Sequence, residues 1–350
     1  MKAFSFYFFS GTGNSRKVAT WFCNEMSNGG VNTSLTDIAK ERETPNAPDK
    51  DVTIGFISPT HGFNYPPLFI YYLLRFPRAK YRNDVLLMNT RAGMKLSKIF
   101  LPGFSGISMW FAAIVLLIKG YKIIGMRSID LPSNWISLHP GLRSKVVTSM
   151  FEHYEIVTRK LARNIMLGKK VFRPLLWIGM PLDLAVMPIA AAYFFVGRFI
   201  LAKTFVATHA CDNCNVCISQ CPIKAISMVY NKPYWSFRCE SCMRCMNNCP
   251  KRAIETAHGV LALIILVLYA GILGLLYKYF PINSWPILGS DSAIDSFGRF
   301  VIESALIFAL LLLVYRLVHY LKRYTWLDAL VSYTSLTKYP FWRRYKAPRN

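Results

Sequence analysis

Residues 211–222, CDNCNVCISQCP, and residues 239–250, CESCMRCMNNCP, contain eight of the nine cysteines in this chain of 350 residues. Both stretches have the spacing C-x2-C-x2-C-x3-C-P. Two copies of one spacing this close together predict a compact unit with an approximate twofold symmetry.

The spacing is typical of cubane [4Fe-4S] clusters. Three thiolates of one tight loop bind one cluster, and the fourth cysteine, which precedes a proline, reaches the other cluster. We therefore predict two clusters. The first is expected to be bound by Cys211, Cys214, Cys217 and Cys249, and the second by Cys239, Cys242, Cys245 and Cys221.

Zinc and disulfides are the alternatives for these cysteines. Zinc ribbons use two C-x2-C pairs, often with histidine, whereas each run here has four cysteines and no histidine lies between Cys211 and Cys249. Disulfide frameworks belong to small secreted domains. The stretch resembles bacterial-type two-cluster ferredoxins, which implies a small α+β domain, and we assign residues 206–257 to it.

The chain is both basic and hydrophobic. It has 42 Lys and Arg against 18 Asp and Glu, a formal charge of +24, and is 53% hydrophobic. This combination favours contact with an anionic membrane surface over nucleic acid, for which no recognition motif is present. The positive charge could also attract acidic redox partners. The apolar start MKAFSFYFF is short and lacks a cleavage site, so we interpret it as a buried strand rather than a signal peptide.

A small polar loop follows this first strand, which we place at Ala3–Phe9. Residues 10–15 read SGTGNS, and residues 16–26 have apolar residues at helical spacing. Backbone N–H groups, three hydroxyls and a helix N-terminus together favour binding of a phosphate. The loop lacks the lysine of a P-loop and the G-x-G-x-x-G of a dinucleotide fold, which argues against ATP and NAD. An ordinary turn with a helix cap is the alternative.

Here the sequence resembles flavodoxins, whose FMN phosphate loop reads much like S-x-T-G-N-[ST]. The resemblance implies bound FMN and two further flavin loops, after strands at Val52–Ser58 and Asp84–Asn89. Arg91 would stabilise a reduced flavin anion, unless it is an exposed loop residue, and the aromatic loop could instead pack on the sheet. The implied FMN-binding residues are Ser10, Thr12, Gly13, Asn14, Ser15, Thr60, His61, Phe63, Asn64, Thr90 and Arg91.

The alternation of strands and helices predicts an α/β fold over residues 1–167, a flavodoxin-like doubly wound parallel sheet of five strands. Residues 121–127 would form the last strand and residues 145–166 the closing helix. Cys23 lies among apolar residues and is expected to be buried and inert. Residues 95–117 are more apolar than a surface helix of a soluble flavodoxin should be, so this stretch is expected to press on a membrane or a neighbouring domain.

The linker of residues 168–205 is apolar, but Pro181, Asp183 and Pro188 interrupt it and Arg198 closes it. A single crossing of the membrane here would separate the flavin from the clusters. We therefore expect broken helices that lie at the membrane interface or pack between domains.

A transmembrane helical hairpin is predicted for residues 258–321. Residues 259–276 contain no charge, and residues 299–321 form a second apolar span with Glu303 near its start. The turn at 281–298 has no Lys or Arg, whereas the tail at 322–350 is basic and aromatic. The positive-inside rule then places the turn outside and the tail in the cytoplasm. The tail would lie along the inner leaflet, unless it is a disordered basic end.

Taken together, residues 1–257 resemble bacterial fusions of a flavodoxin-like domain to a two-cluster ferredoxin. The resemblance implies an electron-transfer protein with FMN and two [4Fe-4S] clusters, anchored in the cytoplasmic membrane with its redox domains and tail on the cytoplasmic side. Two alternatives remain open, a reductase of a quinone or another small acceptor, and a non-catalytic docking subunit of a membrane redox complex. No acid, base or nucleophile constellation for another reaction stands out.

Overall fold

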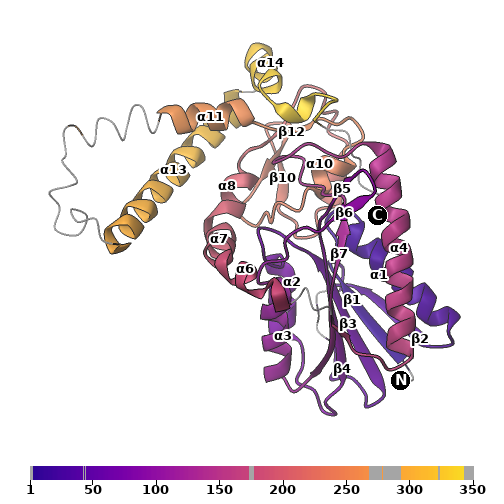
Figure 1. Ribbon diagram of the computed structural model, residues 1–350. Helices are drawn as coiled ribbons and strands as arrows, with labels where there is room; N and C mark the ends of the chain where they lie inside the picture. Colours follow the sequence, from indigo (N-terminus) through magenta and orange to yellow (C-terminus); the bar gives the residue numbers. More distant parts are fainter. Residues whose placement is uncertain are drawn as a thin grey trace.

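A parallel β-sheet forms the centre of the N-terminal domain in this computed structural model, which describes residues 3–41, 43, 45–172, 177–267, 278, 293–321 and 324–342. Six strands lie in the order β2-β1-β3-β4-β7-β8, and every neighbouring pair is parallel (Figure 1). Their bounds are β1 Ala3–Phe8, β2 Asn32–Asp37, β3 Val52–Pro59, β4 Asp84–Ala92, β7 Lys122–Leu131 and β8 Val171–Phe172.

The first five strands of this sheet have the 2-1-3-4-5 order of the flavodoxin-like fold. The predicted fold class is therefore confirmed. The sheet gains a sixth strand, β8, because the chain returns beside β7 after the closing helix. The strand β7 also runs on to Leu131, four residues past the predicted end at Arg127.

Two pairs of helices cover the sheet. Helices α1 (Asn14–Asn28) and α4 (Ser144–Met166) pack on one face, where Phe4, Phe6 and Phe22 form the centre of one core. Helices α2 (Pro67–Arg75) and α3 (Ser108–Ile118) cover the other face (Figure 1). Cys23 is buried in the first core, as expected, and burial raises the pKa of its thiol to about 12.

The apolar stretch at 95–117 is only partly helical. Its first half is a hairpin of β5 (Met94–Leu96) and β6 (Ile99–Leu101), and helix α3 begins only at Ser108. Three large side chains of α3 are more than half exposed, Ile114, Leu117 and Ile118. The helix therefore presents an apolar surface outward, and the predicted contact of this surface with a membrane or a neighbouring domain stays a prediction.

The ferredoxin domain consists of two short antiparallel pairs of strands and two short helices. Strand β9 (Phe205–Ala207) pairs with β12 (Ile254–Thr256), and β10 (Ile226–Val229) pairs with β11 (Lys232–Trp235). Helices α9 (Val216–Ser219) and α10 (Arg244–Asn248) each begin inside one cysteine run.

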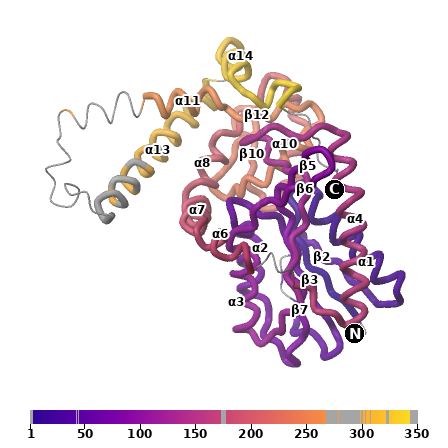
Figure 2. The backbone as a smooth tube through the Cα atoms, in the orientation of Figure 1, coloured from indigo at the N-terminus to yellow at the C-terminus, as the bar shows by residue number. Residues whose placement is uncertain are grey.

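The linker between the domains folds into a chain of short helices. These are α6 (Met180–Ala185), α7 (Met187–Ala192), the π-helix η1 (Tyr193–Gly197) and α8 (Arg198–Ala202). They lie side by side with α3 and the ferredoxin domain in both backbone views (Figures 1 and 2). The last three are continuous and form one apolar helix over Met187–Ala202, which is shorter than a typical membrane span.

The C-terminal region contains α11 (His258–Leu266), α13 (Ala293–Leu321), α14 (Thr325–Tyr333) and the 3-10 turn η4 (Leu336–Lys338). Among the described residues, one helix is long and apolar enough to cross a membrane, at Ser304–Leu321, with a mean hydropathy of 1.9. The predicted first span lies outside the described residues from residue 268 onward, and so do residues 281–292 of the predicted turn. The same holds for residues 322–323 and 343–350 of the tail and for the side chain of Glu303.

Two parts of this region pack on the ferredoxin domain. On α13, Tyr315 Oη accepts a hydrogen bond from the Trp235 backbone N–H at 3.0 Å, and His319 Nε2 lies 3.0 Å from the Val229 carbonyl oxygen. In the tail, Thr337 Oγ1 accepts from the Thr256 backbone N–H at 3.0 Å. The described part of the tail is therefore folded onto the protein, unlike the disordered end considered from the sequence.

Candidate functional site

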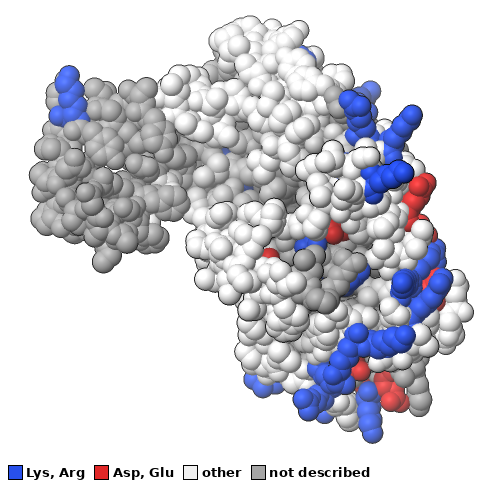
Figure 3. All heavy atoms as spheres, viewed as in Figure 1, with Lys and Arg blue, Asp and Glu red and all other residues white. Residues whose placement is uncertain are grey.

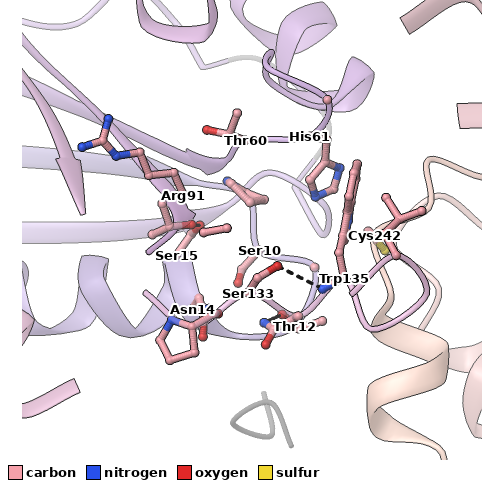
Figure 4. Close-up of a pocket in the computed structure, with 18 of the residues that line it drawn as sticks. Ser10, Thr12, Asn14, Ser15, Thr60, His61, Arg91, Ser133, Trp135 and Cys242 are labelled. Atoms are coloured by element: carbon pink, nitrogen blue, oxygen red, sulfur yellow. Dashed lines mark hydrogen bonds between the residues drawn. The ribbon is translucent and has the colours of Figure 1, made fainter. Parts of the chain in front are cut away.

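A cavity of about 370 Å³ lies at the carboxyl ends of the strands β1, β3 and β4. Figure 4 shows the side chains that surround it. We call it the first cavity. The residues that line it are Ser10, Gly11, Thr12, Asn14, Ser15, Pro59, Thr60, His61, Gly62, Phe63, Thr90, Arg91, Ala92, Phe104, Pro132, Ser133, Asn134, Trp135, Leu138, His139 and Cys242.

The predicted phosphate loop forms the floor of this cavity. Ser10 Oγ accepts a hydrogen bond from the Gly13 backbone N–H at 2.9 Å, which holds the loop in a tight turn. Gly13 has φ 103° and precedes the first residue of α1, so that the N-terminus of the helix adjoins the loop. Such a helix N-terminus favours a bound phosphate.

The second predicted loop contributes three of its four proposed residues. Thr60, His61 and Phe63 line the cavity. Asn64 does not line it; its side-chain oxygen accepts from the Tyr65 backbone N–H at 2.7 Å instead. Burial lowers the pKa of His61 to about 3, so this ring is neutral, and its Nδ1 is buried with no hydrogen-bond partner within the described part of the chain. A bound ligand would supply that partner.

Thr90 and Arg91 end strand β4 rather than beginning a loop. Thr90 Oγ1 lies 2.8 Å from Ser15 Oγ and so joins the phosphate loop to β4. Arg91 lines the cavity, but its Nε lies 2.5 Å from Asp130 Oδ1 and its Nη2 lies 3.2 Å from Asp130 Oδ2. Arg91 is thus largely buried and paired with Asp130 rather than an exposed loop residue, and its role beside a flavin anion stays a prediction.

One wall of the cavity was missed at the level of sequence. Residues 132–139, which follow β7, close the cavity on the side of the ferredoxin domain. The ring of Trp135 lies between His61 and Cys242 in the view of Figure 4, and its centroid is 5.2 Å from that of His61. The Nε1 of Trp135 is buried and has no hydrogen-bond partner among the described residues. The sequence did indicate a loop here, because Trp135 follows the turn-forming residues Pro-Ser-Asn directly after a core strand.

The eight cysteines form two groups of four. Burial and the neighbouring thiols of Cys211, Cys249 and Cys214 raise the pKa of Cys217 to about 11. Burial and the thiols of Cys239, Cys242 and Cys221 raise the pKa of Cys245. These are the two sets that the spacing predicts, each with one cysteine from the other run. We call them the first group, Cys211, Cys214, Cys217 and Cys249, and the second group, Cys239, Cys242, Cys245 and Cys221.

The chemistry of both groups fits iron–sulfur ligation. All four thiols of the second group line one internal cavity, together with Phe205 and Trp235. The Ala225 and Ala253 backbone N–H groups point at the sulfurs of Cys221 and Cys249, at 3.2 and 3.3 Å. Such N–H groups stabilise a reduced cluster.

The second group adjoins the first cavity. Cys242 lines that cavity, and a Cβ atom added at Gly11 would come 2.5 Å from the Cys242 carbonyl oxygen. Only glycine permits this approach of the two loops. Arg244, between Cys242 and Cys245, donates from Nε to the Gly11 carbonyl oxygen at 2.8 Å and from Nη2 to that of Ser10 at 2.5 Å. One cluster-binding loop is thus bonded directly to the phosphate loop.

Comparison with known proteins agrees with this architecture. Residues 210–254 match the family described as 4Fe-4S dicluster domain. The comparison with curated proteins found no match.

Similar solved structures include a short-chain flavodoxin associated with a non-canonical PDU bacterial microcompartment. It is 13% identical, covers 46% of this chain and 99% of its own, and has a TM-score of 0.30. Another is the NAD(P)H:quinone oxidoreductase from Methanothermobacter marburgensis, at 12% identity, 47% and 100% coverage and a TM-score of 0.31. The fold assignment rests on the strand order of the sheet. The chain therefore combines a flavodoxin-like domain with a 4Fe-4S ferredoxin domain, and its function lies in electron transfer or oxidoreduction.

Proposed function

We propose that this protein is a membrane-anchored electron carrier that passes electrons between FMN in the first cavity and two [4Fe-4S] clusters, one in each group of cysteines. The observation that carries the proposal is the position of Cys242, which belongs to the second group and also lines the first cavity. FMN exchanges one or two electrons, and each cluster exchanges one.

The residues of this chain set the order of the relay. The second group is the one next to the first cavity, whereas in the first group Cys214 is exposed and residues 212–215 around it are exposed as well. Electrons would therefore be exchanged with the outside at this exposed loop and pass between the first group, the second group and the flavin in that order. An external redox protein would dock there, beside the exposed Lys224, Lys251 and Arg252, a basic surface that suits an acidic partner.

Attachment to the membrane is supported by two surfaces. One is the apolar helix Ser304–Leu321, of which only 12% is buried. The other is the outer face of residues 177–197, where Asp183 is the only charged residue. Figure 3 shows Lys and Arg gathered on the side of α4, away from the linker helices. The large side chains exposed on this second surface include Trp177, Ile178, Leu184, Ile189 and Phe195.

The packing of α13 limits how much of the proposed anchor can meet lipid. Phe308, Tyr315 and His319 contact Phe237 and the ferredoxin hairpin, so protein covers one side of the helix along most of Ser304–Leu321. Only the other side of the helix would meet lipid. The basic tail would remain in the cytoplasm, as the positive-inside rule predicts.

The proposal is tested by anaerobic purification in detergent from a membrane fraction, with iron, sulfide and flavin assayed on one sample. We expect about eight iron per chain together with one FMN, and reduced-state EPR signals of two interacting clusters. Zinc in place of iron, or iron without flavin in a chain that retains its fold, would contradict it. Recovery of the intact chain from the soluble fraction would contradict the anchor alone.

A further inference from the structure

A second cavity, of about 180 Å³, lies beside the first one and shares Arg91 and Phe104 with it. It is enclosed by the loop between β6 and α3, by β7 and by helix α6 of the linker. We call it the second cavity. Its lining consists of Arg91, Pro102, Gly103, Phe104, Ser105, Met109, Met126, Arg127, Ser128, Gly179, Leu182 and Asp183.

The volume and lining of the second cavity favour one small ring. A cavity of about 150 Å³ holds a benzene molecule, so 180 Å³ suits a substituted six-membered ring and is too small for a nucleotide. Phe104, Met109 and Leu182 supply apolar walls. The hydroxyls of Ser105 and Ser128, 2.9 Å apart, supply a polar end next to Arg91.

Asp183 supplies a second polar end. It lies on α6, and its Oδ2 accepts a hydrogen bond from Trp110 Nε1 at 3.2 Å. Burial raises the pKa of Asp183, against the opposing effects of the Trp110 hydrogen bond and the charge of Arg91. Every other residue from 177 to 197 is uncharged. The apolar surroundings therefore disfavour the charged form of this carboxyl group.

The mouth of the second cavity opens on the apolar surface of the linker. Phe104 and Leu182, which line the cavity, are 58% and 50% exposed, and the neighbouring Ile178 is 73% exposed. A ligand that enters here would come from an apolar phase and reach the edge of the first cavity at Phe104. Such a ligand is lipid-soluble, ring-shaped and polar at two ends.

We propose that the second cavity binds the ring of a lipid-soluble quinone, which accepts electrons from the flavin in the first cavity while Asp183 donates a proton to one ring oxygen. This inference rests on the proposed function and names its acceptor. Reduction of the quinone to the quinol takes two electrons and two protons. Both electrons come from FMN that the two clusters have reduced, one electron at a time, with electrons from the external redox protein at the exposed loop. One proton comes from the Asp183 carboxyl group, and the other comes from solvent that enters through the open side of the first cavity.

Binding is tested with a decyl-substituted benzoquinone titrated into the detergent-solubilised holoprotein. The exchange Leu182→Trp fills the second cavity and is expected to weaken binding at least tenfold. Leu74→Trp is the matched control, because Leu74 is 47% exposed, lies on α2 and lines neither cavity. Unchanged affinity of L182W would overturn the assignment.

The role of Asp183 is tested with Asp183→Asn, which keeps the size of the side chain and its acceptor for Trp110 but cannot donate the acidic proton. We expect quinone reduction to slow by about a hundredfold, with affinity changed less than threefold and flavin-to-cluster transfer unchanged. Equal loss in both reactions would contradict a specific role for Asp183. If flavin-to-cluster transfer is absent in the wild-type chain while L182W still weakens quinone binding, the relay fails and the binding site stands.

Discussion

The two cysteine runs share one spacing and one backbone but have different surroundings. Asn213 and Asn215 of the first run and Ser241 and Met243 of the second all have φ between 51° and 61°, so the two loops follow the same path. The side chains between the cysteines differ. In the first run Asp212, Asn213 and Asn215 are exposed. In the second run Glu240, Met243 and Arg244 contact the flavodoxin-like domain. The cysteines therefore determine the clusters, and the residues between them determine which cluster meets the flavin.

Three pairs of equivalent residues carry this difference. Val216 corresponds to Arg244, which bonds to the phosphate loop, and Asn215 corresponds to Met243, which is 1% exposed. Asp212 is exposed, whereas its equivalent Glu240 is 7% exposed and accepts a hydrogen bond from the Leu68 backbone N–H at 2.9 Å. The same substitution at both positions of a pair therefore compares the two runs, with one position as the control for the other.

The largest effect is expected from loss of a cluster ligand. Cys242→Ser should remove the cluster next to the first cavity and slow flavin-to-cluster transfer by more than a hundredfold. Cys214→Ser should remove about four iron as well, yet leave the flavin able to reduce the remaining cluster. Iron content and anaerobic stopped-flow absorbance separate the two variants. Equal transfer rates in both would contradict the proposed order of the relay.

A smaller effect is expected from the arginine that joins the domains. Arg244→Met removes two hydrogen bonds from a charged donor to the carbonyl groups of Ser10 and Gly11. Each such bond contributes ~1.5–3 kcal/mol, so we expect FMN to dissociate at least tenfold more readily. Val216→Met, the equivalent exchange, should leave the FMN affinity within twofold. Fluorescence titration of the apoprotein with FMN measures both, and equal affinities would show that Arg244 does not support the loop.

The smallest effect is expected from the acidic pair. Glu240→Ala leaves the half-buried Leu68 N–H without its acceptor, which should reduce the free energy of unfolding by ~1–3 kcal/mol. Asp212→Ala, at an exposed position, should leave it unchanged. Urea unfolding of the anaerobic holoprotein measures both variants. If D212A and E240A lost the same free energy of unfolding, the hydrogen bond of Glu240 to Leu68 would not account for the difference between the two runs.

The parts of the fold that follow from local sequence could be predicted. The cysteine spacing is a property of two short loops, and the strand, SGTGNS loop and helix at the N-terminus are consecutive in the chain. Each of these two segments can therefore be recognised from its own residues, without knowledge of the rest of the fold. The parallel α/β class of the sheet also followed, because strands and helices alternate along the chain.

The contacts between distant segments could not be predicted. Trp135 meets His61, and Arg244 meets the phosphate loop, only in the folded protein, and no periodicity marks either residue. Asn64 was expected to face FMN, but a hydrogen bond to the adjacent Tyr65 N–H turns its side chain away. The hairpin at 94–101 was not predicted, because it is apolar like α3 and composition alone does not distinguish a strand from a helix.

The central claim is that electrons pass directly between the flavin in the first cavity and the cluster bound by Cys242. Laser-flash reduction of the flavin in the anaerobic holoprotein, followed by the absorbance of the flavin and the clusters, tests it most directly. We predict that the flavin is reoxidised as the clusters are reduced, in a first-order step whose rate does not depend on protein concentration. A rate that rises with protein concentration, or a flavin that stays reduced beside oxidised clusters, would contradict the relay.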